Sequence, residues 1–363
     1  MVYLKDICVK ASSSIAQKDL EGHEGQYPIY GAAGYIMDVD FYHQDKPYVA
    51  IVKDGAGVGR VMCLPAFSSV IGTLQYIIPT SDTNVHYLAY ALEHMNLAKY
   101  YTGATIPHIY FKDYCMEKLP RHSWQEQQSI ATRLSNVDTL IALRKQQMAK
   151  LDELVKARFV EMFGDPVADG KQDTEVPLGS LAEIGSSKRI FEKEYVSDGV
   201  PFYRTKEIVE LSKGNGITTE LFISNERYAE IRSEYGVPQK GDLLISAVGT
   251  IGVIWIVDGE RDFYFKDGNL LRVSASKAFE PVYLKYLLET LIGAHKSKMS
   301  SGTAYAALTI SMLKEMPVIE VPLSLQHQFA AFVAQTDQQK LTIQHSLAQL
   351  ELLKKALMQK YFG

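Results

Sequence analysis

Residues 127–164 read QQSIATRLSNVDTLIALRKQQMAKLDELVKARFVEMFG, and a related stretch, QHQFAAFVAQTDQQKLTIQHSLAQLELLKKALMQKYFG, follows 199 residues later at residues 326–363. Aligned without gaps, ten of the 38 positions are identical. Neither copy contains Pro, and Gly occurs only as the last residue of each. Because Pro and Gly are the residues that interrupt helices most strongly, each copy is predicted to form one long helix.

Apolar residues in both copies recur at alternating steps of four and three. In the first copy these positions are Ile130, Leu134, Val137, Ile141, Met148, Leu151 and Val155, with Arg144 as the polar interruption. In the second copy the same register contains Phe329, Val333, Thr336, Lys340, Ile343, Leu347, Leu350, Lys354 and Leu357. This spacing is typical of the contact seam of a coiled coil.

At 1.5 Å per residue, each helix would be roughly 55–60 Å long. A helix of that length buries too little surface on its own to be stable in water. We therefore expect the two helices to pack on each other along their seams. Two alternatives remain open: each helix lies separately on its own globular segment, or the weaker second seam, with Lys340 and Lys354, faces partner subunits.

The composition is that of a globular protein with more than one domain. A chain of 363 residues fits two or three domains, and 47% hydrophobic and 22% charged residues are ordinary values. No apolar run approaches 18 residues, and the first residues lack the pattern of a secretory signal. Cys8, Cys63 and Cys115 have no metal-ligand spacing and are expected to be reduced thiols. We expect a cytoplasmic protein without a membrane partner.

Bulk charge gives no support for nucleic-acid binding. The net charge is −4, whereas nucleic-acid-binding domains usually carry a basic patch or stripe. Residues 177–316 contain 17 Lys and Arg against 18 Asp and Glu. A DNA-binding role therefore has to rest on other features of the sequence.

Strand-rich segments precede both predicted helices. Short apolar runs separated by Gly and Asp turns, such as YVAIV at residues 48–52, are typical of strands. Gly164 followed by Pro166 ends the first helix. The predicted fold class is α+β, with two globular domains each followed by a long helix. The predicted segments are domain one, helix one, linker, domain two and helix two: residues 1–120, 121–164, 165–176, 177–318 and 319–363.

Weaker similarities extend the repeat into the globular halves. Five short stretches of the first half match stretches of the second half in the same order, ahead of the matching helices. The pairs are residues 4–7 with 181–184, 27–30 with 200–203, 57–61 with 250–254, 87–92 with 283–288, and 102–105 with 301–304. Their common order indicates that the whole chain is a duplicated unit.

This order of parts resembles the specificity subunit of type I restriction-modification systems. The motifs that carry the resemblance are a Tyr-Pro-Ile-Tyr-Gly stretch, a Gly-rich turn after a strand, a Ser-Gly-Thr followed by Leu-Thr-Ile-Ser-Met-Leu, a Pro ahead of a Gln-rich helix start, and the Phe-Gly-Asp-Pro helix exit: residues 27–31, 55–59, 301–303, 308–313, 120 and 163–166. The resemblance covers the whole chain.

The resemblance implies a subunit without catalysis of its own. Each globular domain would read one half of a split double-stranded DNA target. The helices, as an antiparallel coiled coil, would space the halves and dock two methyltransferase subunits, with restriction subunits joining in the full complex. Because the two halves differ heavily in sequence, we expect an asymmetric target. A coiled-coil scaffold or adaptor, whose globular halves bind proteins, is the alternative.

Catalytic and cofactor motifs are not found in the sequence. There is no Asn/Asp-Pro-Pro-Tyr/Phe motif for holding a flipped adenine, no Walker loop and no His-Glu-x-x-His. Residues 55–59, GAGVG, resemble a nucleotide-binding loop, but a strand follows and not a helix whose N-terminus could receive a phosphate. We interpret them as a tight turn that lets two backbones pass closely. No cofactor or metal is expected.

Arg, Lys, Asn, Ser and Thr side chains beside predicted turns are the candidates for DNA contacts, since these types bind base edges and phosphates. Each is equally compatible with an ordinary solvated loop. The primary candidates are Lys53, Arg60, Thr105, Lys188, Arg189, Arg204, Lys206, Ser246, Thr250, Lys266, Asn269 and Tyr305. His43, Gln44, Asp54, Thr102 and His108 are secondary candidates in the first half. Lys206, Arg204 and Lys53 rank highest because they adjoin predicted strand ends.

Overall fold

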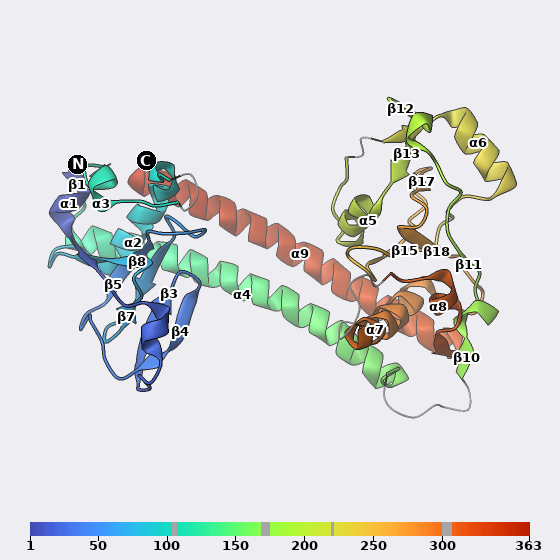
Figure 1. The fold of residues 1–363 in the computed structure, drawn as a ribbon, viewed down its shortest axis with the longest axis horizontal. Helices are drawn as coiled ribbons and strands as arrows, with labels where there is room; N and C mark the ends of the chain where they lie inside the picture. Colours follow the sequence, from blue (N-terminus) through green and yellow to red (C-terminus); the bar gives the residue numbers. More distant parts are fainter. Residues whose placement is uncertain (104–106, 168–174, 219–220, 300–306) are drawn as a thin grey trace. The chain divides into compact units, whose positions relative to one another are not determined.

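The computed structural model describes residues 1–363 except 104–106, 168–174, 219–220 and 300–306, and except the side chains of 297–299. The chain divides into two compact units. Unit 1 comprises Met1–Gln147 and Thr342–Gly363, and unit 2 comprises Met148–Leu341. Each unit therefore contains a globular segment together with a part of both long helices (Figure 1). Among the described helices, none is long and apolar enough to cross a membrane.

Unit 1 is built around a buried central strand, β5 (Tyr48–Val52). It lies in an antiparallel sheet of order β2-β8-β5-β6, whose other strands are Cys8–Ser12, Leu74–Pro79 and Val61–Leu64. Successive side chains of a strand point to opposite faces. Val49 and Ile51 accordingly join a core with the helix α2 (Val85–His94), while Tyr48 and Ala50 join a second core with β3 (Tyr27–Gly31), β4 (Gly34–Val39) and β7 (Ser69–Val70).

Unit 2 repeats this plan. Its sheet has the order β11-β18-β15-β16, with strands Ile184–Gly185, Leu270–Val273, Leu243–Ser246 and Ile254–Ile256. Leu243 and Ile245 face a core with α7 (Pro281–Met299), and Leu244 faces a second core. The second sheet has the order β12-β14-β13-β17, with strands Tyr195–Val196, Phe222–Ile223, Val200–Tyr203 and Tyr264–Phe265. Helices α5 (Thr205–Ser212) and α6 (Asn225–Glu234) complete the unit. The predicted α+β class is confirmed.

A short strand pair closes each globular segment ahead of its helix. In unit 1, β1 (Val2–Tyr3) pairs with β9 (Lys118–Leu119); in unit 2, β10 (Glu175–Pro177) pairs with β19 (Pro317–Ile319). The next residue donates its backbone N–H back across the pair in both units, Leu4 to Glu117 and Leu178 to Met316. Leu4 thus corresponds to Leu178, and the predicted match of residues 4–7 with 181–184 is wrong by three residues.

The long helices are α4 (Trp124–Phe163) and α9 (Leu323–Phe362). At the start of α4, Glu126 accepts from the backbone N–H and the hydroxyl of Ser123 (2.7 and 2.8 Å), and the Ser123 hydroxyl accepts from the N–H of Glu126, which is a capping box. After α4, Gly164 takes the left-handed conformation (φ 79°) that suits a helix exit.

The two helices contact each other in antiparallel order within each unit. In unit 1, the ion pairs Asp138–Lys354 (2.9 Å) and Lys145–Glu351 (3.5 Å) join α4 to α9. In unit 2, the rings of Phe159 and Phe329 lie 5.4 Å apart, and Lys340 pairs with Asp152 at 2.6 Å. Both seam lysines, Lys340 and Lys354, therefore face α4, and the alternative that they face partner subunits is wrong.

The seam residues are shielded along both helices. Ile130, Leu134, Val137, Val155, Phe329 and Val333 are buried. The other apolar seam positions are half-buried: Ile141, Met148, Leu151, Ile343, Leu347, Leu350 and Leu357. The ends of the helices also pack on the globular cores: Ile130 and Leu134 join the α2 core, and Phe329 and Val333 join the α7 core. The alternative of helices lying on their own globular segments is therefore correct for the beginning of each helix.

Candidate nucleic-acid interface

A glycine-containing loop follows the central strand of unit 1, between β5 and β6. Gly59 donates its N–H to the carbonyl of Val52 (2.8 Å), and Val52 donates to the carbonyl of Arg60 (3.0 Å). Gly59 has φ 86°, and a Cβ added there would lie 2.6 Å from the backbone nitrogen of Ala98. Only glycine fits this combination of conformation and close approach. The interpretation of residues 55–59 as a tight turn with close backbone passage is confirmed.

The loop gathers several predicted residues of unit 1. Nδ1 of His108 lies 2.6 Å from Oδ1 of Asp54, and Nζ of Lys53 lies 3.8 Å from Oδ2 of Asp54. His108 also exchanges two backbone hydrogen bonds with Thr102 (both 2.8 Å). Lys53, Asp54, Thr102 and His108 therefore form one group beside the loop.

The other candidates of unit 1 lie apart from that group. Arg60 donates from Nη1 to the carbonyl of Ala32 at 2.8 Å, which ties it to the β3–β4 hairpin. His43 and Gln44 pair through their backbones with Ser68, beside β7. Thr105 lies outside the described residues.

An equivalent loop follows the central strand of unit 2, between β15 and β16. Gly252 donates to the carbonyl of Ser246 (2.9 Å), as Gly59 does to Val52 in unit 1. Ser246 is fully buried, and its hydroxyl accepts from the N–H of Val253 (2.9 Å) and donates to the carbonyl of Thr250. The prediction that Ser246 contacts DNA is therefore wrong, because its side chain closes the turn. Thr250 lies exposed in this loop, and Tyr305 lies outside the described residues.

Most candidates of unit 2 gather elsewhere, around the parallel strands β13 and β17. Parallel neighbours end at the same edge of a sheet, so Arg204 and Lys266, which directly follow these strands, lie side by side. Lys266 donates its backbone N–H to the carbonyl of Tyr203 (2.8 Å). Lys188 donates its N–H to the hydroxyl of Tyr264 in β17 (2.6 Å).

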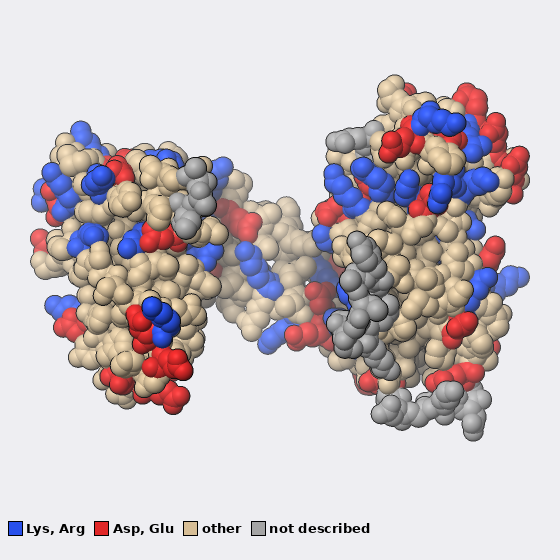
Figure 2. Space-filling model, viewed as in Figure 1, with Lys and Arg blue, Asp and Glu red and all other residues tan. Residues whose placement is uncertain are grey.

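We name this group the basic edge of unit 2; it comprises Lys188, Arg189, Arg204, Lys206 and Lys266. Asn269 lies apart from it, where its carbonyl accepts from the N–H of Ala247 after β15 (2.8 Å). Figure 2 shows Lys and Arg side chains in a band across this unit, at the level of β13 and α5 in Figure 1. Burial raises the pKa of Tyr264, which keeps its hydroxyl protonated beside Lys188.

Arg204 has a structural role within the basic edge. Its backbone N–H donates to Oε2 of Glu207 (2.9 Å), and its Nη2 donates to Oε1 (3.0 Å). The Glu207 side chain is 1% exposed. A buried carboxylate requires such a partner, and removing one partner of a buried pair is strongly destabilising. Arg204 therefore anchors the start of α5.

Sequence reasoning missed two carboxylates of the basic edge. Glu207 holds Arg204, and Asp267 accepts from Nε of Arg189 at 2.7 Å. Both follow a candidate cation by one residue, Lys206 and Lys266. The sequence shows each carboxylate directly after a lysine, and this was the feature that could have drawn attention to it. The sequence does not show that the partner of each carboxylate is an arginine, Arg204 or Arg189.

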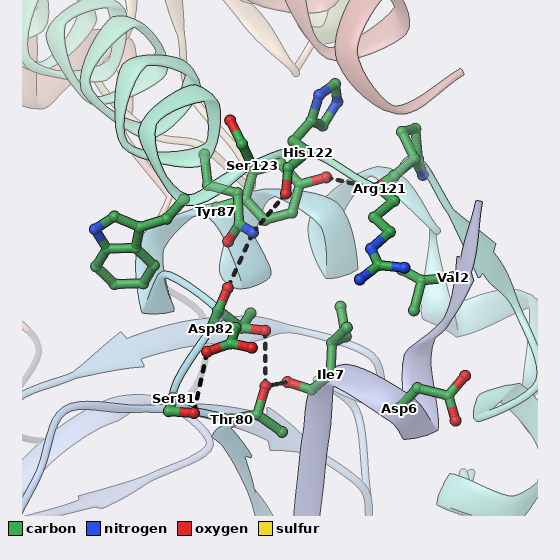
Figure 3. A pocket seen from close by; sticks show the side chains of 14 residues that line it. Val2, Asp6, Ile7, Thr80, Ser81, Asp82, Tyr87, Arg121, His122 and Ser123 are labelled. Carbon is green, nitrogen blue, oxygen red and sulfur yellow. Dashed lines mark hydrogen bonds between the residues drawn. The ribbon is translucent and has the colours of Figure 1, made fainter.

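A cavity of about 850 Å³ opens in unit 1 where α4 begins. In Figure 3, Arg121 reaches toward Val2 from the segment before α4, and Asp82 lies on the other side of the cavity. Gln127 forms part of the wall and donates to the carbonyls of Asp82 (3.1 Å) and His122 (3.0 Å). None of the predicted DNA-contacting residues lines this cavity. Across the described residues, no three His, Cys, Asp or Glu side chains are grouped to hold a metal ion.

Comparisons with known proteins give the family. The model of the type I restriction modification DNA specificity domain matches residues 1–153 and 171–352. A protein of Haemophilus influenzae assigned as a type I restriction enzyme specificity subunit is 25% identical over 327 residues, which cover 85% of this chain and 80% of that protein. The MjaIX specificity subunit of Methanocaldococcus jannaschii is 24% identical over 314 residues, covering 78% and 69%.

Solved structures share the fold. The type I restriction-modification S subunit from M. genitalium superposes with a TM-score of 0.61 at 18% identity, covering 100% of this chain and 95% of that one. A chain from a structure of complex assembly and conformational transition in the type I restriction-modification system gives 0.58 at 17% identity, covering 99% and 96%. With both halves of the chain matched by the family model, this protein belongs to the type I restriction-modification DNA specificity subunit family.

Proposed function

We propose that this chain is a non-catalytic subunit that reads a bipartite, asymmetric DNA target, with one half-site for each unit. The observation that carries the proposal is the repeated frame with unlike side chains at its loops. Asp54 and His108 meet at the glycine loop of unit 1, and the matching backbone positions of unit 2 hold Val248 and Ala307. Different side chains on one frame suit the recognition of different base pairs.

The paired helices have a separate role in this proposal. We infer that α4 and α9 set the spacing between the half-sites and dock two methyltransferase subunits, which supply the catalysis. The repeated order of strands in the two units supports this role, because a duplicated reader can bind two half-sites as a dimer does.

The near-neutral charge bears on affinity. Contacts of Lys and Arg with DNA phosphates give much of the affinity and add to its salt dependence. A chain of net charge −4 has no overall excess of Lys and Arg to make many of these contacts. We expect the isolated chain to bind DNA weakly and to lose this binding as salt rises, and the partner subunits to supply most of the phosphate neutralisation. Tight, salt-insensitive binding by the isolated chain would contradict this.

Co-expression with the methyltransferase of the same system, followed by sequencing that detects methylated bases, tests the proposal. The expected result is adenine methylation within one split motif whose two halves differ. Methylation that is independent of this chain, or failure of this chain to recover the methyltransferase in a pull-down, would instead support a scaffold or adaptor.

A further inference from the structure

The chain segment around Arg189 is tied to the neighbouring strands at three points. The hydroxyl of Ser186 donates to the first carbonyl of β18 (3.0 Å), and the N–H of Lys188 donates to the hydroxyl of Tyr264 (2.6 Å). Ile190 is buried in the core that contains residues of β13 and β17. Arg189 is therefore carried by a backbone that is held on both sides.

One side of the Arg189 guanidinium is fixed by a carboxylate. Nε of Arg189 donates to Oδ2 of Asp267 at 2.7 Å. The side chain of Arg189 is 67% exposed, whereas that of Asp267 is 12% exposed. In the part of the chain that the structure describes, the Nη groups of Arg189 make no hydrogen bond or ion pair. Both Nη groups of the guanidinium are thus left without a partner among the described residues, while Nε is held by Asp267.

The stability of the fold does not explain this pair. Ion pairs with an exposed partner contribute little to stability. The second carboxylate oxygen, Oδ1 of Asp267, is buried and has no hydrogen-bond partner among the described residues. Burying a carboxylate oxygen that accepts no hydrogen bond lowers the stability of the fold. A buried oxygen of this kind in a folded protein therefore indicates a role other than stability. Asp267 orients a cation at the surface, which is what a recognition site requires.

We propose that Arg189 reads a guanine of the half-site bound by unit 2, and that Asp267 is its positioning residue. This inference rests on the proposed function of the chain. The paired N–H groups of arginine match O6 and N7 of guanine in the major groove, which is the commonest specific contact between proteins and DNA. Lys188 and Lys266 directly precede Arg189 and Asp267 in the sequence, and we expect them to contact the adjoining phosphates.

The first test compares methylation motifs after co-expression with the methyltransferase. Wild type is expected to show a guanine at one position of the half-site read by unit 2. Arg189→Ala and Arg189→Lys are expected to lower the preference for guanine at that position by about tenfold to a hundredfold, since lysine cannot make the bidentate contact. Asp267→Asn is expected to weaken the same preference by a smaller factor. The half-site read by unit 1 should stay unchanged in all three variants.

Arg232→Ala is the matched control, because Arg232 pairs with Asp262 on the same unit (3.8 Å) with both side chains largely exposed. It should leave the motif unchanged. An unchanged motif in both Arg189 variants would overturn the inference, as would a uniform loss of methylation across all sequences, which is the mark of a phosphate contact. If wild type itself directs no sequence-specific methylation, the proposed function fails.

A second test uses the assembled complex and synthetic DNA. Replacing the assigned guanine by 7-deazaguanine removes the N7 acceptor and keeps the base pair. Wild type should bind the modified DNA about tenfold more weakly, by loss of a specific contact, whereas Arg189→Ala should show no further loss. Equal sensitivity of the two proteins would show that Arg189 does not contact N7, and the inference would be wrong.

Discussion

In unit 1 the residues that flank the central strand include Asp54, which pairs with His108 at 2.6 Å. The same backbone positions in unit 2 hold Val248 and Ala307, and the charged side chains of that unit gather at the basic edge. The backbone hydrogen bonds of the two glycine loops match, but the side chains do not. The two units therefore share their buried cores and the backbone of their loops, and they differ in the side chains that these loops carry.

The interiors match down to single residues. Gln127 accepts from the N–H of Asn84 (2.9 Å) and donates to two carbonyls in unit 1, and Gln326 accepts from the N–H of Glu280 (2.8 Å) and donates to two carbonyls in unit 2. Both glutamines are buried. Each therefore ties the start of its long helix to the start of the helix after the central sheet.

Each interior also takes residues from the other copy of the repeat. Phe159 of α4 is buried in unit 2, where its ring lies 5.4 Å from that of Phe329. Met358 and Phe362 of α9 are buried in the core of unit 1. Neither globular segment is complete without the helix of the other.

The largest expected effect on stability comes from a substitution that disrupts the hydrophobic core of one unit and leaves the core of the other unit intact. Phe159→Ala should destabilise unit 2 by about 3–5 kcal/mol, because it removes a large buried ring and leaves a cavity. Hydrogen exchange should speed up in β15 and β18 and stay slow in β5 and β8. Phe191→Ala, at an exposed ring of the same unit, is the control. Equal loss of protection in both units would contradict the division of the cores.

A smaller effect tests whether the two interiors are equivalent. Gln127→Ala and Gln326→Ala should each lower the free energy of unfolding by about 1–3 kcal/mol, because three partly buried hydrogen bonds to backbone groups are lost in each case. The measurement is denaturant unfolding of both variants beside Gln128→Ala, whose side chain is exposed. A large cost for one glutamine and none for the other would show that the repeat is not preserved in the interior.

The smallest expected effect concerns Lys354, where the two seams differ. Partial burial lowers the pKa of Lys354, but the hydrogen bonds to Asp138 and Glu93 raise this pKa by a larger amount. The net shift of the pKa is therefore upward. A raised lysine pKa stabilises the fold below the unfolded pKa and loses that contribution as pH rises through the folded pKa. Lys354→Met should change stability by about 1 kcal/mol or less at neutral pH, and should remove the part of the stability decline above pH ~10.4 that this lysine causes. An unaltered alkaline profile would show that the pair is not coupled to folding.

The sequence was sufficient for the frame because the frame obeys periodic rules. The four-three spacing placed both long helices within a few residues, and the order of the short repeats indicated two similar units. The sequence shows that Gln127 and Gln326 are identical positions of the repeat. It does not show the structural role of these glutamines, because their hydrogen-bond partners include backbone groups that are distant in the sequence.

The candidate interface was less predictable, for physical reasons. Ser246 stands beside a predicted turn as its neighbours do, and only the tertiary structure shows that its hydroxyl is turned inward. Arg204 and Arg189 look alike in sequence, yet a carboxylate at 1% exposure holds one of them at the start of a helix. Arg189 instead is 67% exposed and pairs with Asp267, a carboxylate distant in the sequence.

In the proposed function, the two units read different half-sites through loop side chains. The most direct test is to determine the methylation motif of complexes that contain His108→Ala or Arg189→Ala, one variant in each unit. We expect each variant to alter one half of the motif and to leave the other half as in wild type, and we expect the two variants to alter different halves. Alteration of the same half by both variants, or of neither half by either, would contradict it.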